Sequence, residues 1–468
     1  MRRIISTAAV FGLILAACGG GAPAGAPGAT TGPAGAPPAK PSTAASAGAP
    51  AASGAASAKP AASGSAKPAA SASAKPAASG GASTVGVPGA DLKLGAVLPL
   101  TGAQAAPGKY FQQGYEMAIN EANAAGGIDV GGKKLRVGLT LYDDGTDGTK
   151  SRALVEKLVT QDKVNELLGG YDTPLVQAQS AVPDQYKIPM VEGGGAASAI
   201  FSRGYKYIFG TLQTIDKLGT ITMDFLKNEV DQGHLTKPSK IALVWENTDH
   251  GKDYQKGVQD WVKTNQGYFN VVLDQSFELN GTDFTPLLTQ VKSSNADIFL
   301  SDAHLNDYIT MHRQYTQQGL SHKVVSYGAR GPDQRGREAL GPAADGIVAG
   351  LWWSPIMSDA RSQKFTADYK AKYNATPDWY QALAYDTAKV MFAGISKAGT
   401  LDGPKVRDAL ASLEYKDSLL PGGTVKFLED GRPTTPYLMV QNTANNGVEI
   451  VWPKDMPGFK PAVVPWKK

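Results

Sequence analysis

Residues 93–98 read KLGAVL, residues 110–124 read YFQQGYEMAINEANA and residues 135–142 read LRVGLTLY. The first and third segments are short apolar runs of the length of strands, and the middle segment has the length and composition of a helix. Two parallel strands need a long crossover between them, and a helix usually supplies it. This stretch therefore predicts a strand–helix–strand unit with a parallel sheet.

The same alternation continues along the chain in two series. Segments expected as helices or strands occur at 150–160, 164–168 and 175–186 in the first series, and at 240–245, 251–265, 270–273, 284–294, 298–301, 306–318 and 323–327 in the second. Short strands alternating with helices indicate parallel sheets flanked by helices. Residues 91–468 also exceed what one hydrophobic core usually serves. We therefore expect an α/β fold with two Rossmann-like lobes and a ligand between them.

The N-terminus has the pattern of an export signal. Arg2 and Arg3 precede about 14 apolar residues, too few to span a bilayer core of roughly 30 Å. Residues 15–18, LAAC, resemble the bacterial lipobox, in which the cysteine is acylated and becomes the new N-terminus. The expectation is a signal peptide at 1–17 and an extracytoplasmic protein anchored to the cell membrane through lipidated Cys18.

Residues 18–90 have the composition of a disordered tether. They contain no aromatic and no acidic residue, and SAKPAAS repeats at 57–63, 65–71 and 73–79. The net charge of +4 becomes −2 for residues 91–468 once the six cations before Asp91 are set aside. The basic balance therefore belongs to the N-terminal part, and it gives no case for nucleic-acid binding.

The motifs of catalysis and metal binding are absent or incomplete. Residues 145–151, GTDGTKS, lack the glycine before the lysine of a phosphate loop, and residues 143–148, DDGTDG, lack ligands of a calcium loop. Cys18 is the only cysteine, and the five histidines show no metal-ligand spacing. The sequence predicts no enzyme, no metal and no cofactor.

Several motifs, in order, carry a resemblance to a known family. They read KLGAVLPLTG (93–102), GYEMAINEANAAGGI (114–128), LYDDGTD (141–147), VEKLVTQDKVNELLGG (155–170), QALAYDTAKVMFAGISKAG (381–399) and GGTVKFLEDGRPTTP (422–436). Together they resemble the type I periplasmic solute-binding proteins of branched-chain amino acid ABC transporters. This resemblance implies a Venus-flytrap clamp, a monomer of two lobes joined by a three-strand hinge, which docks on ABC permease subunits.

The resemblance also implies domain limits. Lobe 1 would take residues 91–213 and 352–418, lobe 2 would take residues 214–351 and 419–451, and residues 452–468 would form a C-terminal extension. No covalent chemistry is implied.

Two loops of lobe 1 match the carboxylate-binding segments of the family. Thr173 follows Tyr171 and Asp172 in GGYDTP (169–174), where a hydroxyl meets the ligand, although a threonine here could instead cap the next helix. The loop GGGAAS (193–198) places Gly194, Gly195 and Ala196 where backbone N–H groups would face an anion. Ala196 lacks the expected hydroxyl, which Ser198 could supply unless it caps the following helix.

Lobe 2 departs from the family pattern. His250 and His304 stand where the family often has tyrosines that contact the ligand. Each histidine could likewise contact the ligand, or it could face solvent from a loop. The amino-acid binders carry an acidic residue near 328–330, whereas this chain has Gly328, Ala329 and Arg330. Asp172 or Asp302 could pair with a ligand ammonium instead, and Arg330 could pair with a carboxylate or reach solvent. Aromatic residues expected near the cleft are Tyr110, Tyr171, Tyr327, Trp352, Trp353, Trp379 and Tyr380.

The sequence thus leads to a functional hypothesis. The chain would capture a small solute, either an amino acid, an aromatic or other small carboxylate, or an amide. It would then deliver this solute to a membrane permease. The alternative is a clamp that reports its ligand to a membrane receptor or kinase.

Overall fold

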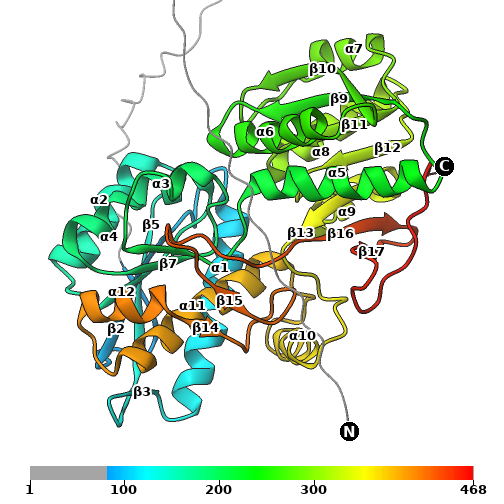
Figure 1. Ribbon diagram of the computed structural model, residues 1–468. Helices are drawn as coiled ribbons and strands as arrows, with labels where there is room; N and C mark the ends of the chain where they lie inside the picture. The colour runs from blue at the N-terminus through cyan, green and yellow to red at the C-terminus, as the bar shows by residue number, and fades with distance from the viewer. Residues whose placement is uncertain (1–81, 467–468) are drawn as a thin grey trace, which may run out of the picture. The chain divides into compact units, whose positions relative to one another are not determined.

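The first of two main sheets is formed by the N-terminal half of the folded chain in the computed structural model, which describes residues 82–466 (Figure 1). Its strand order is β1-β5-β2-β6-β7-β8. The strands are β1 (Ser83–Gly86), β2 (Leu92–Leu98), β5 (Val137–Asp143), β6 (Glu166–Leu168), β7 (Met190–Glu192) and β8 (Ile208–Gly210). All neighbours pair in parallel except β1 with β5. The loops that follow the parallel strands therefore share one edge of the sheet.

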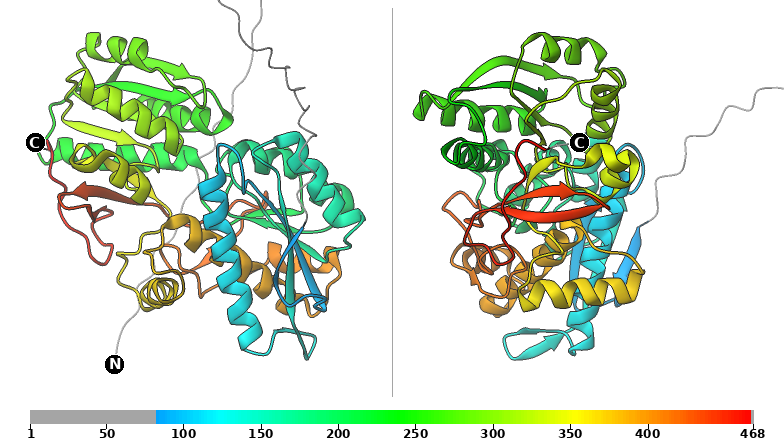
Figure 2. Two further views of the ribbon diagram at one scale, coloured as in Figure 1. Left: turned by 180° about the vertical axis from the view of Figure 1, so that it is seen from behind. Right: turned by 90° about the vertical axis from the view of Figure 1, so that its right-hand side faces the viewer.

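Helices from two distant parts of the chain pack with this sheet. They are α1 (Ala105–Ala124), α2 (Gly148–Thr160), α3 (Thr173–Gln179), α4 (Ala181–Tyr186), α11 (Trp379–Ala398) and α12 (Gly403–Ala411). Helices α1 and α11 lie side by side (Figure 2). Gly114 permits this approach, because a Cβ there would lie 2.3 Å from the carbonyl oxygen of Gln381. Residues 379–411, which form α11 and α12, thus belong structurally with the first sheet.

The second sheet has the order β10-β9-β11-β12-β13-β16-β17. Its strands are β9 (Ser239–Glu246), β10 (Phe269–Phe277), β11 (Ile298–Asp302), β12 (Val324–Tyr327), β13 (Val348–Leu351), β16 (Leu438–Thr443) and β17 (Gly447–Trp452). The helices after residue 214 and before α11 are α5 (Ile215–Asp231), α6 (Asp249–Thr264), α7 (Thr285–Ser293), α8 (Leu305–Gln317), α9 (Gln334–Leu340) and α10 (Ala360–Tyr373). Two small antiparallel pairs complete the strands: β3 (Ile128–Val130) with β4 (Lys133–Leu135), and β14 (Glu414–Tyr415) with β15 (Val425–Lys426).

The α/β class and the two parallel-dominated sheets confirm the fold predicted from the alternating pattern. One predicted helix, 175–186, is divided into α3 and α4. Pro183 lies four residues after Gln179 and has no N–H to donate to its carbonyl, so the helix cannot continue unbroken. Within residues 82–466, no helix is both long and apolar enough to cross a membrane.

The predicted tether at 18–90 requires a correction at its C-terminal end. Residues 83–86 form β1 and pair with β5, and Val85 is buried. The composition concealed this strand, because only Val85 of its four residues is buried and its pairing partner β5 lies far along the chain. The signal peptide, Cys18 and the tether up to residue 81 lie outside the described residues.

Three passages of the chain between the sheets are bonded to one another. The carbonyl oxygen of Gln213 accepts hydrogen bonds from Trp352 Nε1 at 2.9 Å and from the Tyr437 hydroxyl at 2.8 Å. The N–H of Gly210 on β8 donates to the carbonyl of Gly431 at 2.9 Å. Residues near 431 therefore still contact the first sheet. The last crossing of the chain from lobe 1 to lobe 2 follows these residues and does not lie between 418 and 419 as predicted.

Candidate functional site

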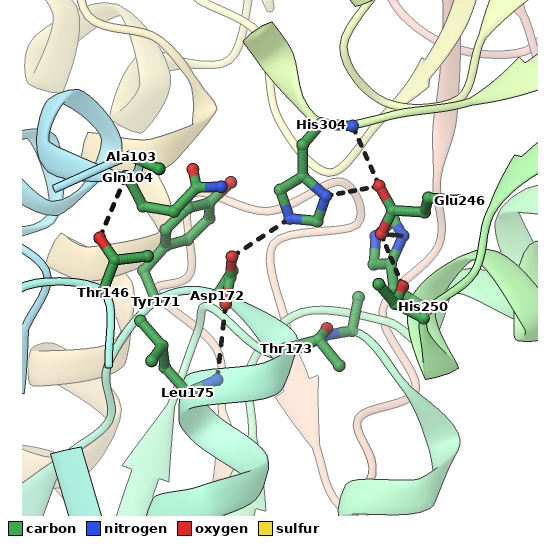
Figure 3. Close-up of polar contacts among 12 residues, drawn as sticks. Ala103, Gln104, Thr146, Tyr171, Asp172, Thr173, Leu175, Glu246, His250 and His304 are labelled. Carbon is green, nitrogen blue, oxygen red and sulfur yellow. Dashed lines mark hydrogen bonds and ion pairs between the residues drawn. The ribbon is translucent and has the colours of Figure 1, made fainter. Parts of the chain in front are cut away.

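Side chains that follow strands of both sheets meet in one buried place (Figure 3). Asp172 follows β6 and is the N-cap of α3, where its Oδ1 accepts from the N–H of Leu175 at 3.4 Å. His304 follows β11, and its Nε2 lies 3.4 Å from Asp172 Oδ2. Asp172 is 3% exposed and His304 is 2% exposed. This ion pair joins the first sheet to the second, and water is largely excluded from it.

His304 is oriented by a buried carboxylate of its own sheet. Its Nδ1 lies 2.6 Å from Glu246 Oε2, and its backbone N–H donates to the same oxygen at 3.1 Å. Burial alone would lower the pKa of His304, but Glu246 and Asp172 outweigh burial and hold that pKa well above its usual value. Burial would likewise raise the pKa of Glu246, whereas His304 and His250 lower it below its usual value. The pair is therefore an imidazolium and a carboxylate at neutral pH.

His250 extends this polar cluster toward β11. Its Nδ1 lies 2.7 Å from Asp302 Oδ2, and its buried Nε2 has no hydrogen-bond partner in the described part of the chain. Glu246, His250 and Asp302 place donor atoms within 4.8 Å of one another, so they could hold a metal ion. Each of the three already has a charged or hydrogen-bonding partner in the cluster. A cation would therefore have to replace existing contacts.

Arg330 is buried, which excludes the alternative that it reaches solvent. It is 3% exposed, and its Nη2 donates to the Tyr171 hydroxyl at 3.2 Å. Its Nε and Nη1 have no partner within residues 82–466. Its Cζ lies 4.9 Å from the ring centroid of Trp379 and 5.8 Å from that of Tyr380. The guanidinium is thus held against aromatic rings with donors to spare.

Five of the seven aromatic residues predicted near the cleft form one chain of ring contacts. These contacts are Tyr110–Tyr380, Tyr171–Tyr380, Trp379–Tyr380 and Trp352–Trp379, with centroids 3.9 to 5.7 Å apart. Trp353 instead packs on Phe365, and Tyr327 packs within the second sheet's core on Phe299 and Tyr308. The structure therefore separates Trp353 and Tyr327 from the rings around Arg330.

The GGGAAS loop differs from the expectation of free backbone donors. Glu192 Oε2 accepts from the N–H groups of Gly194 at 2.9 Å and Gly195 at 2.7 Å. Burial raises the pKa of Glu192 to about 8, although these two N–H groups oppose the rise. The chain's own carboxyl group occupies the donors that were predicted to face a ligand.

The remaining hydroxyl predictions can also be compared with the structure. Thr173 Oγ1 accepts from the N–H of Ala196 at 3.0 Å, so its hydroxyl joins the two loops of the first sheet. Asp172, not Thr173, is the capping residue of α3. Ser198 begins a short 3₁₀ helix without capping it, and its N–H donates to Asp253 Oδ2 at 2.6 Å.

Three acidic residues at the site were not predicted from the sequence: Glu192, Glu246 and Asp333. Glu192 and Glu246 are the last residues of β7 and β9, and both are fully buried. Asp333 accepts from the Tyr380 hydroxyl at 2.9 Å, and burial raises its pKa. For Glu192 and Glu246 the available signal was an acidic residue at the end of an apolar strand, at the edge of the sheet where ligands bind in α/β proteins. Asp333 lies in the loop after β12 and had no such signal.

Gly328 lies beside Asp302 rather than offering an empty space. A Cβ at Gly328 would be 2.4 Å from Asp302 Oδ1, and the residue has a φ of +54°. The resemblance implied an acidic side chain near residue 328. In the structure, the carboxylate of Asp302 occupies the space beside Gly328.

Comparisons with known proteins agree with this architecture. A family model described as "Periplasmic binding protein" matches residues 91–447. The Leu/Ile/Val-binding protein homolog 8 of Brucella abortus is 24% identical over 375 residues, which cover 78% of this chain and 91% of that protein.

Two solved structures show the same fold. A leucine-binding protein from Thermotoga maritima has a TM-score of 0.67 at 20% identity, covering 77% of this chain and 98% of its own. A solute-binding protein of an ABC transporter from R. palustris, in complex with benzoate, has a TM-score of 0.66 at 20% identity, covering 80% and 97%. The two-lobed type I fold expected from the sequence is confirmed by these structures.

Proposed function

The chain belongs to the periplasmic binding protein family, and from this premise we propose that it captures a small carboxylate or amino-acid-like solute for an ABC importer. Proteins of this family are solute-binding proteins rather than enzymes, and they act outside the cytoplasm. The solute would bind between the two sheets, and the closed form would deliver it to membrane permease subunits.

One observation carries this proposal: buried polar side chains from both sheets contact each other at the loops that follow the strands. The contacts Asp172–His304 and Tyr171–Arg330 each join one sheet to the other. Gln177 Nε2 also donates to Asp249 Oδ2 at 3.0 Å between the same two parts. Burying charged groups costs free energy that pairing must offset, and buried groups with shifted pKa values in clefts between α/β units are typical of ligand sites.

The proposed ligand-binding set follows from this arrangement. It comprises Tyr171, Asp172, Thr173, His250, His304 and Arg330. Gly194, Gly195 and Ala196 are left out because their N–H groups already donate to Glu192 and Thr173, and Gly328 is left out because Asp302 lies beside it. Related structures have been solved with isoleucine and with benzoate, which supports a small carboxylate as the solute class.

Two further parts of the proposal concern organisation. The lobes would be divided near residues 213 and 351, with the third passage after Gly431. Cys18 would carry the lipid anchor, and incorporation of labelled fatty acid into the wild type but not into a Cys18→Ala variant would support it. Equal labelling of both would refute the anchor.

A thermal-shift panel tests the solute-binding function. Amino acids, aromatic acids, aliphatic acids, amides and urea are added separately, and a ligand that binds only the folded state raises the Tm by mass action. His304→Gln should reduce the shift, whereas His234→Gln should leave it unchanged, because His234 pairs with Glu229 away from the site. The absence of a shift with every class at millimolar concentration would contradict the proposal.

A further inference from the structure

We propose that Arg330 is the anion receptor of this site and that the solute is a small carboxylate without an ammonium group. This inference rests on the proposed function, because it assigns the solute class of the same site. Arg330 is 3% exposed, and its Nε and Nη1 have no hydrogen-bond partner among the described residues. Arginine remains protonated in proteins, so a buried guanidinium with unpaired N–H groups requires an acceptor.

The surroundings of Arg330 supply aromatic rings and two carboxylates, Asp302 and Asp333, which act on it electrostatically but are hydrogen-bonded to His250 and Tyr380 instead. No carboxylate in the described part of the chain lies within 4.0 Å of its nitrogens. Trp379, whose ring lies 4.9 Å from Cζ, also has a buried Nε1 without a partner in residues 82–466. A carboxylate can accept two N–H groups of one guanidinium at once, and its apolar body can lie against the neighbouring rings. The unsatisfied groups therefore match an anionic, flat or apolar solute.

The carboxylates of the site are already paired, which argues against a solute ammonium. Asp172 lies 3.4 Å from His304 Nε2, and Asp302 lies 2.7 Å from His250 Nδ1. Glu246 accepts from His304 and from the Thr248 hydroxyl. An ammonium entering this site would compete with two imidazoles for these acids, whereas a carboxylate at Arg330 would meet unpaired donors.

The alternative anion site, the glycine-rich loop after β7, is occupied by the chain itself. Glu192 accepts from the N–H groups of Gly194 and Gly195, and Thr173 accepts from that of Ala196. The solute carboxylate is therefore directed to the loop after β12 of the second sheet. This orientation is opposite to the one that the resemblance to amino-acid binders implied.

Two pairs of matched probes test the inference by isothermal titration calorimetry. Leucine is compared with 4-methylpentanoate, which has the same shape without the ammonium, and benzoate is compared with benzamide, which has no charge. The wild type should bind at least one acid, each acid about tenfold or more tighter than its matched partner.

Variants then test whether Arg330 is the anion receptor. Arg330→Gln should weaken binding of the acid by about 10- to 100-fold, and Arg330→Lys should weaken it less. Arg313→Ala is the matched control, because Arg313 is exposed on α8 and donates to the carbonyl of Ala339. Tyr171→Phe, which removes the acceptor of Nη2, serves as a second variant and should give a smaller loss. Unfolding midpoints check that each variant is folded.

Several results would overturn the inference. Tighter binding of leucine than of 4-methylpentanoate would refute the solute class. Unchanged affinity for the acid in a folded Arg330→Gln variant would refute the role of Arg330 as the anion receptor. If none of the four probes bound at about 10 mM, the inference would fail, whereas the proposed function would still stand if another member of the thermal-shift panel bound.

Discussion

Glu192 offers a prediction whose size follows from the structure. This carboxyl group is fully buried at the end of β7, where burial raises its pKa from 4.5 to about 8. The unfolded chain loses this proton near 4.5 and the folded protein near 8, so the folded state holds one more proton between these values. The free energy of unfolding should therefore fall as the pH rises from about 4.5 to about 8.

The magnitude comes from the interval between the two values. From 4.5 to about 8 is about 3.5 pH units, which corresponds to about 5 kcal/mol at about 1.4 kcal/mol per unit. Glu192→Gln keeps an oxygen that can accept from Gly194 and Gly195 but cannot ionise. We expect this variant to match the wild type near pH 5 and to be more stable near pH 8.5 by up to this amount.

Urea unfolding of both proteins at several pH values provides the measurement. The difference between them isolates Glu192, because other buried acids titrate equally in both. Near pH 5, where Glu192 of the folded wild type is protonated, Glu192→Ala should instead be less stable than the wild type by about 1 to 3 kcal/mol for each N–H left unpaired. Parallel curves for wild type and Glu192→Gln would refute the reasoning, since they would show that Glu192 does not bind a proton on folding.

The cluster around His304 leads to further predictions. A double-mutant cycle of Asp172→Asn and His304→Gln should show a coupling free energy of about 1 to 3 kcal/mol in solute binding, because each substitution removes one partner of the same contact between the sheets. Additive effects of the two substitutions would contradict that contact. The raised pKa of His304 means that its contribution to stability is complete below about 6.5 and is lost as the pH rises through the higher folded value, so His304→Gln should lack this alkaline loss in urea unfolding. The lowered pKa of Glu246 gives the opposite sign: its contribution is present above about 4.5 and is lost as the pH falls through the folded value, and Glu246→Gln should lack that acid loss. Because Glu246 and Asp302 already face imidazoles, dialysis against EDTA should change the Tm by less than about 1 °C, and a larger fall would reveal a bound cation.

The fold could be read from the sequence because its signal is local. Strands such as residues 298–302 are short apolar runs between amphipathic helices, and their order predicts parallel pairing. What the sequence did not reveal depends on single residues or on distant partners. Pro183 divides one helix, and β1 pairs with β5, a strand that lies far from it in the sequence.

The sequence placed the candidate site residues at strand ends but did not show how they pair with one another. Tyr171, Thr173, His304 and Arg330 were placed at strand ends, and the loops do bring them close to one another. The sequence could not show that Glu192 would bind the glycine loop, because an acid after a strand is also common in ordinary turns. Which donors remain unpaired is decided by contacts between residues far apart in the chain.

Gly328 and Asp302 together restrict how this site could be redesigned. An acidic side chain at position 328 would place its Cβ 2.4 Å from Asp302 Oδ1, on a backbone whose φ of +54° disfavours most side chains. Asp302 cannot move freely to make room, since His250 holds its other oxygen. Introducing an acid at position 328 by a single substitution is therefore sterically opposed, and a designed amino-acid binder would need a change at Asp302 as well.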